Sequence, residues 1–375
     1  MQSLLRKLLI DNSKLQRMKR LMPLMLLLML PLWLSGQQTK ILTAEKHNEY
    51  GLVYTLPLTA FQIDVTAIKE TSVSGPFGKY SKLFTSDANI IQEDNVAWTI
   101  ESVTVTPYGI PDNEKEYLMQ LKPGALTFIS VSEDGMLLSI NKETESDEEV
   151  DESREGLIGE PVTGKEYLEY VNEDFIAAQS SYKQAQILAE EIMDIRDAKI
   201  SLTRGTAETM PTDGRQLEIM LASLEKQEKA LSNAFTGASW KEKIVRSFTF
   251  LPEKEGKSVL FRLSKSDGIV DANDYSGAPI YVNVKVIEEG ELPVDTKGEE
   301  KKLPKDAVIY SIPGLAELSL SYEGAQLYEK EFQMSQFGIQ FGLNPNIFTD
   351  KKEPSYAIFD PATGALKELG VVNTK

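Results

Sequence analysis

The stretch that decides the fold is residues 181–235, SYKQAQILAEEIMDIRDAKISLTRGTAETMPTDGRQLEIMLASLEKQEKALSNAF. Its apolar residues recur at intervals of three and four, the period of an α-helix with one buried face. They are Ala185, Leu188, Ile192, Ile195 and Leu202 in the first run, which Lys199 interrupts, and Leu217, Leu221, Leu224, Leu231 and Phe235 in the second. The pattern predicts two long helices, and their short connection predicts an antiparallel hairpin.

The connection between the two runs is the predicted tip of this hairpin. Asp213 is a suitable N-cap, and Gln216 three residues later completes a capping box. We expect Leu188, Ile192, Leu221 and Leu224 to hold the helices together, and the tip to be an interaction site made of Met210, Pro211, Thr212, Asp213 and Gly214. The alternative is that the hairpin is a clamp between two β modules, with its tip buried.

Strands are predicted on the N-terminal side of the helices. Phe61, Ile63, Val65 and Ala67 alternate with polar residues, which is the period of a half-buried strand. A second strand is expected around Trp98–Val105, with a bulge where its alternation slips between 100 and 103. Ala125–Val131 and Met136–Ile140 flank an Asp-Gly turn and predict a β-hairpin.

Strands are also predicted on the C-terminal side. Ile244–Leu251 and Lys257–Leu263 flank Pro252–Gly256 as an expected hairpin, and Ser355–Phe359 and Ala365–Leu369 form the closing pair. The predicted fold is therefore α+β, with two β-rich, sandwich-like modules separated by the long antiparallel helical hairpin. The expected domains are 37–142 (β-rich), 143–164 (an acidic linker), 165–237 (the helical hairpin) and 238–375 (β-rich).

The linker prediction depends on residues 143–155, ETESDEEVDESRE, most of which are acidic. The segment offers no apolar face to bury, so it cannot offset the entropy of ordering the chain. We therefore expect an exposed linker there.

Residues 1–36 resemble a secretory signal peptide. The apolar run LMPLMLLLMLPLWL at 21–34 follows Arg17, Lys19 and Arg20 and precedes the small residues Ser35-Gly36. As a helix it would be about 21 Å long, which is short of the ~30 Å needed to span a bilayer. We expect export to the periplasm or cell surface, with cleavage near Gly36-Gln37. Residues 1–17 are either a misassigned start before Met18, which we favour, or a long N-terminal region of the signal peptide.

Composition excludes several classes of function. The chain has no cysteine, which rules out a lipoprotein anchor, disulfides and thiolate metal sites. Its single histidine, His47, leaves little room for imidazole chemistry. Removing residues 1–36, with six Lys/Arg and one Asp, changes the net charge from −17 to −22. That charge repels nucleic acid, and we expect no nucleic-acid partner.

No motif predicts a catalytic residue, a cofactor or a metal. Asp267, Asp271, Asn273 and Asp274 could offer oxygen ligands to calcium, but Tyr275 and Ser276 stand where the EF-hand pattern needs a ligand and glycine. An ordinary polar loop is our interpretation. Gly256-Lys257-Ser258 mimics the end of a phosphate-binding loop, but the earlier glycine is replaced by Leu251, and we interpret it as a hairpin turn.

Several segments carry a resemblance to a known family. They are TAFQIDVTAIKETSVSGPFGKY (59–80), VTVTPYGIPD (103–112), SEDGMLLSIN (132–141), EEIMDIRDAKISLTRG (190–205), MPTDGRQLEIMLASLEKQEKALSNAFTG (210–237), DGIVDANDYSGAPIYVNV (267–284) and YSIPGLAELSL (310–320). Together they resemble domain-of-unknown-function family 4831, an exported family of Bacteroidetes. The resemblance implies export and the β–helical hairpin–β layout, and it brings no activity and no catalytic residues.

Two functions from different classes follow from these observations. The first is a non-enzymatic protein that binds or scaffolds another component of the cell envelope, an envelope protein or a glycan. The second is an envelope hydrolase that acts on glycans with Asp and Glu alone. A cleft holding two facing carboxylates at a glycosidase separation would distinguish the second from the first.

Overall fold

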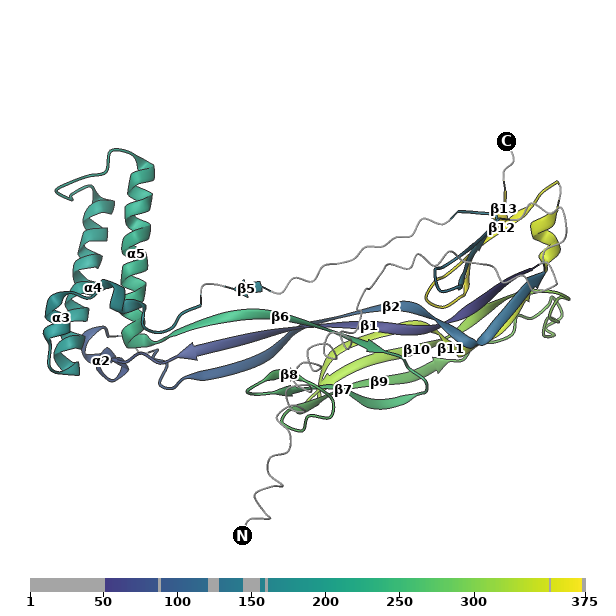
Figure 1. Cartoon of the computed structure of the whole chain (residues 1–375), viewed down its shortest axis with the longest axis horizontal. Helices are drawn as coiled ribbons and strands as arrows, with labels where there is room; N and C mark the ends of the chain where they lie inside the picture. Colours follow the sequence, from purple (N-terminus) through teal and green to yellow (C-terminus); the bar gives the residue numbers. More distant parts are fainter. Residues whose placement is uncertain are drawn as a thin grey trace, which may run out of the picture. The chain divides into compact units, whose positions relative to one another are not determined.

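The computed structural model describes residues 51–86, 89–120, 128–143, 156–158, 161–350 and 352–372. The chain divides into two units, Met1–Glu45 and Lys46–Lys375, and every described residue belongs to the second. This unit is mostly β, with several sheets, as the sequence predicts (Figure 1). The expected signal segment 1–36, His47 and residues 144–155 of the linker lie outside the described residues.

The first sheet is organised around the long strand β1 (Gly51–Val73). One edge of β1 pairs antiparallel with β2 (Asn95–Gln120) along most of its length. The register shifts where Thr66 pairs with Ser102 and Ala67 with Ile100, which places a bulge at Glu101. The bulge that the slipped alternation predicts between 100 and 103 is therefore confirmed.

The other edge of β1 pairs with a strand that follows the helices. β6 (Ala238–Phe250) is antiparallel to β1 from Phe61 to Val73, and β5 (Gly156–Ile158) pairs with β6. The order in this sheet is β2-β1-β6-β5. A strand of the expected C-terminal range thus completes the sheet of the expected N-terminal range.

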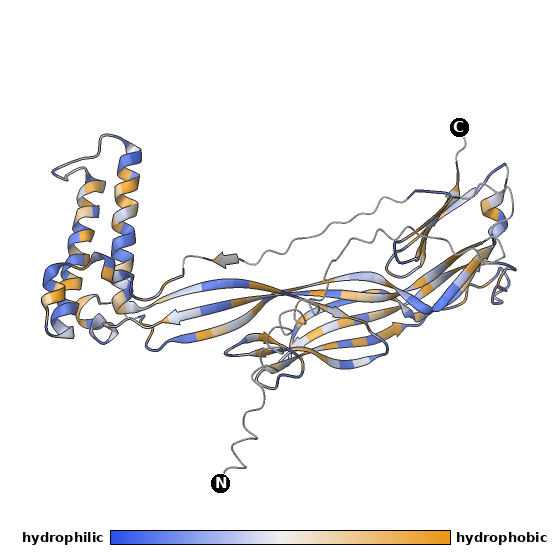
Figure 2. Cartoon of the chain, viewed as in Figure 1, coloured by the Kyte–Doolittle hydropathy of each residue, from blue (hydrophilic) through white to orange (hydrophobic). Residues whose placement is uncertain are grey.

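The second sheet contains five antiparallel strands in the order β11-β10-β9-β7-β8. Their bounds are Gly256–Ser264 (β7), Gly268–Val270 (β8), Ala278–Glu288 (β9), Val308–Tyr322 (β10) and Ala325–Leu343 (β11). Hydrophobic and hydrophilic residues alternate along the strands of both sheets (Figure 2). This alternation gives each sheet one apolar face to bury.

The two sheets pack face to face around the largest core. Phe61, Ile63 and Val65 of β1 are completely buried against the apolar residues of β7, β9, β10 and β11. The Phe61 and Phe332 rings meet edge to face with centroids 5.0 Å apart. The sandwich-like packing that we expected inside each module is therefore formed between strands of both ranges.

A smaller third sheet has the order β13-β12-β4-β3. Its strands are Ile129–Val131 (β3), Leu137–Ile140 (β4), Ser355–Phe359 (β12) and Leu366–Val371 (β13). They pack with the 3-10 helix η3 (Pro345–Thr349) and with the Gly51 end of β1. The predicted β3–β4 and β12–β13 hairpins are both confirmed, with Gly135 (φ 82°) and Gly364 (φ 69°) in the turns.

The remaining described elements are helices. They are η1 (Gly78–Tyr80), α2 (Ser81–Phe84), η2 (Glu166–Tyr170), α3 (Glu173–Ala177), α4 (Ser181–Arg204) and α5 (Gly214–Thr236). α5 leads directly into β6 through Gly237, which has a positive φ of 77°. A Cβ at Gly237 would lie 2.5 Å from the carbonyl oxygen of Val73, so only glycine fits where α5 meets the first sheet.

Two expectations about the strands are corrected by this topology. The two β-rich ranges do not form separate modules, because β6 pairs with β1 and β12 pairs with β4. Likewise β6 and β7 are not a hairpin, and Gly256-Lys257-Ser258 is not its turn, because the chain crosses from the first sheet to the second at 251–255. Phe248 and Phe261, expected on paired strands, instead stack between the two sheets with centroids 4.7 Å apart.

Candidate functional site

The two long helices position the tip residues through local capping. The side chain of Asp213 accepts a hydrogen bond from the Gln216 backbone N–H at 2.8 Å, which confirms Asp213 as the N-cap of α5. The Gln216 side chain accepts from the backbone N–H of Thr212 at 3.0 Å. α4 ends at Gly205, whose left-handed φ of 72° is the usual C-terminal signal.

One half of the helix pair is anchored in an apolar cluster. Leu188 and Ile192 of α4 are buried with Leu231 and Phe235 of α5. Phe77 joins them from the segment after β1, and its ring lies 6.0 Å from that of Phe235. The expected contacts of Leu188 and Ile192 are therefore confirmed.

The half of the helices nearer the connection packs more loosely. Leu221 and Leu224 are only half-buried, in contrast to the full seal that we expected from them. Leu221 and Leu224 lie near the end of the apolar stripe of α5, next to the connection between the helices. They therefore have fewer apolar neighbours than Leu231 has. The apolar seal thus weakens toward the tip.

Ion pairs join the two helices where a charged residue interrupts the apolar stripe of α4. Glu228 of α5 accepts from Arg196 Nε at 2.6 Å and from Lys199 Nζ at 3.1 Å, both on α4. Burial favours the neutral carboxyl, but these two hydrogen bonds outweigh it and hold the pKa of Glu228 below its usual range. Lys199, which breaks the apolar periodicity in the sequence, is thus a polar contact between the helices.

Replacing Glu228 with glutamine is expected to lower the free energy of unfolding by about 1 kcal/mol at pH 7. Because folding lowers the pKa of Glu228, its charge stabilises the protein above the unfolded-state pKa, and this contribution disappears as the pH falls through the folded-state pKa. The difference from wild type should therefore shrink as the pH falls through the folded-state pKa and vanish below it. Urea unfolding at several pH values measures it. Glu218→Gln, at an exposed position of the same helix, is the control and should leave the free energy of unfolding at pH 7 nearly unchanged.

The five predicted interaction residues lie together at the tip between α4 and α5. Met210, Thr212, Asp213 and Gly214 are exposed, and Pro211 is half-buried. Exposed apolar side chains continue onto the adjoining turns as Ile200, Ile219 and Met220. Sequence reasoning missed these three; the signal available was that each is apolar yet falls outside the buried stripe. We call these eight residues the tip surface.

The four residues weighed for calcium lie between the end of β7 and the start of β9, and the carboxylates of Asp267 and Asp274 have other partners there. The Asp267 carboxylate accepts hydrogen bonds from the Ser264 and Ser266 hydroxyls. The Asp274 carboxylate accepts from the Ser276 backbone N–H at 2.9 Å, which lowers the pKa of Asp274. No group of three or more metal-ligating side chains occurs among the described residues.

Arg262 holds the same loop through two hydrogen bonds and a contact with a tyrosine ring. Arg262 Nε donates to the Ala272 carbonyl at 2.8 Å and Nη1 to the Gly277 carbonyl at 3.1 Å. Its guanidinium also lies 4.5 Å from the centroid of the exposed Tyr275 ring. The loop is therefore held by a protein cation, which is consistent with the polar-loop interpretation.

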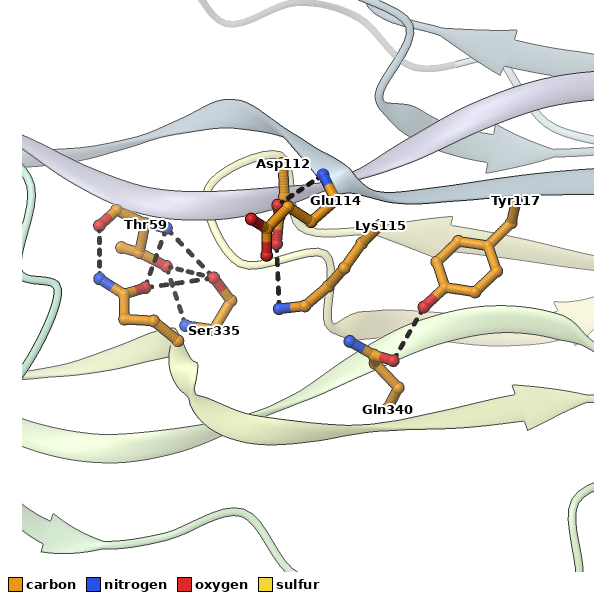
Figure 3. Close-up of polar contacts among 8 residues, drawn as sticks. Thr59, Asp112, Glu114, Lys115, Tyr117, Ser335 and Gln340 are labelled. Carbon is orange, nitrogen blue, oxygen red and sulfur yellow. Dashed lines mark hydrogen bonds and ion pairs between the residues drawn. The ribbon is translucent and has the colours of Figure 1, made fainter.

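A buried polar junction joins β1 to β11 (Figure 3). The backbone N–H of Thr59 donates to Ser335 Oγ and to Gln336 Oε1, each at 3.1 Å. Gln336 Nε2 donates back to the Thr59 carbonyl at 2.9 Å. The pairing of β6 with β1 ends at Phe61. Beyond that point the side chains of Ser335 and Gln336 provide the hydrogen bonds that the backbone of β1 needs at Thr59.

A bulge in β11 positions the side chains of Ser335 and Gln336. Residues 335–338 stand between Met334, which pairs with Gly314, and Ile339, which pairs with Ile312. A Cβ at Gly338 would lie 2.2 Å from the Ile312 carbonyl oxygen, so the bulge needs glycine there. The junction is thus a structural joint between sheets.

Charged and polar residues of β2 lie beside this junction (Figure 3). The buried Asp112 forms an ion pair with Lys115 at 3.0 Å and accepts from the Glu114 backbone N–H at 3.1 Å. Tyr117 donates its hydroxyl hydrogen to Gln340 Oε1 at 2.8 Å, which links β2 to β11. The Tyr117–Gln340 contact joins the two sheets, whereas the contacts of Asp112 lie within β2.

The carboxyl pKa values that are shifted among the described residues all move in one direction. Every Asp or Glu in the described ranges whose pKa departs from its ordinary value is shifted downward. A glycosidase acid needs the opposite shift, so that it stays protonated near neutral pH. None of these shifted carboxyl groups therefore has the raised pKa of a glycosidase acid.

The fold defines a mostly β protein that carries a helix pair between its strands. In the part of the chain that the structure covers, no helix is both long and apolar enough to cross a membrane. The family model described as "Domain of unknown function (DUF4831)" matches residues 50–367, so the chain belongs to this family. Neither the search of curated proteins nor the search of solved structures found a match.

Proposed function

We propose that this protein is an exported, non-enzymatic binding or scaffolding component of the cell envelope that contacts its partner through the tip surface. The observation that carries the proposal is the exposure of apolar side chains on the tip surface, with Ile219 62% and Met210 41% exposed. Surface apolar residues that cluster on one element are typical of interaction sites.

The scaffold beneath the tip surface supports the proposal. The helical hairpin is anchored at the Phe235 end and capped at Asp213, so the tip residues are presented on a defined framework. The alternative of a clamp requires the tip to be buried against strands. The exposure of Met210, Thr212 and Gly214 argues against that alternative.

Export is the second part of the proposal and depends on residues 17–36, where a basic flank, an apolar run and small residues follow one another. Sequencing the N-terminus of protein taken from producing cells tests it. A mature N-terminus within a few residues of Gln37 supports export to the periplasm or cell surface. An intact Met1 or Met18 on cytoplasmic protein overturns it.

Replacing Ile219 with aspartate is expected to leave the unfolding temperature nearly unchanged, because the side chain is mostly exposed. The same change should reduce the complexes recovered by chemical crosslinking in cells by about tenfold or more, since it places a charge in an apolar contact. Gel analysis of crosslinked cells measures the loss.

The matched control for this experiment is Ile287→Asp. Ile287 is another exposed apolar residue, 46% accessible, on β9 of the second sheet. The Ile287→Asp variant should retain every crosslinked complex. Equal loss in both variants, or no loss in Ile219→Asp, would argue against the tip surface as the interaction site.

A further inference from the structure

A hollow of about 370 Å³ lies where β2 begins and β7 and β10 end. It is lined by Asn95, Val96, Ala97, Trp98, Leu263, Ser264, Lys265 and Tyr322. Its size falls at the lower end of the ~300–1,000 Å³ typical of small-molecule sites. The hollow is remote in sequence from the tip surface and shares no residue with it.

Two aromatic side chains contribute to the hollow. Trp98 of β2 and Tyr322 of β10 are both half-buried, and both pack against the core between the two sheets. A Cβ at Gly268, which has a φ of 75°, would lie 2.6 Å from the Trp98 ring, so a glycine makes room for the indole. Half-buried rings of this kind offer an apolar surface beside a polar edge.

The polar groups of the hollow include donors without partners. The Trp98 indole nitrogen makes no hydrogen bond, but it is shielded from solvent, so a ligand in the hollow does not reach it. The exposed side chains of Asn95 and Lys265 also make no hydrogen bond or ion pair within the described ranges.

Charge limits the class of ligand. The chain carries −17 overall, and Asp94, Asp267 and Glu323 adjoin or lie close in sequence to the lining residues. An anionic ligand would be repelled, although Lys265 partly offsets this field. A ligand rich in uncharged hydroxyls can accept from the donors and place its C–H groups on the aromatic rings.

We propose that this hollow binds an uncharged saccharide, with one sugar ring against Tyr322 and Trp98 and its hydroxyls bonded to Asn95 and Lys265. This site is independent of the tip surface, so either proposal can fail without the other.

The test is a ligand-observed NMR titration of the purified mature chain with four probes. Three are neutral, namely glucose, maltotriose and the trimer of N-acetylglucosamine, and glucuronate is the charged comparison. At least one neutral probe should bind saturably at millimolar concentration or below. Glucuronate should bind at least tenfold more weakly than the best neutral probe.

Substitutions in the hollow test whether the saccharide binds there. Tyr322→Leu should weaken the best neutral probe by about tenfold, and Trp98→Leu by several-fold, because each replaces a ring that the sugar contacts. Tyr182→Leu, at an exposed tyrosine of α4, is the control and should bind as wild type does. Circular dichroism confirms that each variant is folded.

The proposal is overturned if no neutral probe binds saturably or if glucuronate binds more tightly than all of them. It is equally overturned if folded Tyr322→Leu and Trp98→Leu bind the best probe as wild type does.

Discussion

Replacing Phe235 with alanine is expected to lower the free energy of unfolding by about 3–5 kcal/mol. Phe235 is completely buried near the end of α5, within 6.0 Å of the Phe77 ring, in the cluster that also holds Leu188, Ile192 and Leu231. Truncation removes this contact area and leaves a cavity where α5 meets the segment after β1. Urea unfolding followed by far-ultraviolet circular dichroism measures the change.

The control for this prediction lies on the same helix. Ile219→Ala also shortens an apolar side chain, but Ile219 is mostly exposed, so its effect should stay within about 0.5 kcal/mol. A loss of less than 1 kcal/mol in Phe235→Ala would contradict the anchoring of the helix pair by this cluster.

The second large effect is expected at Phe61, in the core between the sheets. Phe61→Ala should also cost about 3–5 kcal/mol, because its ring is completely buried against Phe332 of β11.

The same core predicts that a fragment of residues 238–375 does not fold alone, since β6 would lose its pairing with β1. Circular dichroism and proteolysis of the fragment provide the measurement.

Two separate modules would give the opposite result for the fragment. A cooperative unfolding transition in 238–375 would show that the C-terminal strands form their own core. The natural control is residues 51–372, which contain both sheets and should unfold cooperatively.

Local features of the fold could be predicted from the sequence. The alternation from Phe61 to Ala67 predicts the central strand and its buried face, and the slip near Glu101 predicts the bulge opposite Thr66. The Asp-Gly pair at 134–135 and the cap at Asp213 specify their turns because short-range sterics and hydrogen bonds act within a few residues.

The pairing of strands could not be predicted in the same way. Alternation in β6 shows that the strand has a buried face, but it carries no information that its neighbour is β1, about 180 residues earlier. Proximity in sequence favoured a β6–β7 hairpin, whereas burial of Phe248 against Phe261 places those strands in opposite sheets. The junction of Thr59 with Ser335 and Gln336 depends on the same long-range packing.

The candidate site was predicted in part. The turn residues from Met210 to Gly214 mark the connection between two apolar stripes, so their position as a tip follows from periodicity. The exposure of Ile200, Ile219 and Met220 beside them depends on how the helices rotate against each other. Apolar periodicity alone does not fix that rotation.

Photocrosslinking from the tip surface tests the central claim most directly. A photoreactive amino acid at Met210 should yield a discrete covalent adduct in producing cells. The same group at Leu369, an apolar residue of β13 with similar exposure (48% against 41%), should not yield that adduct. No adduct from Met210, or the same adducts from both positions, would contradict the proposal that the tip surface binds a partner.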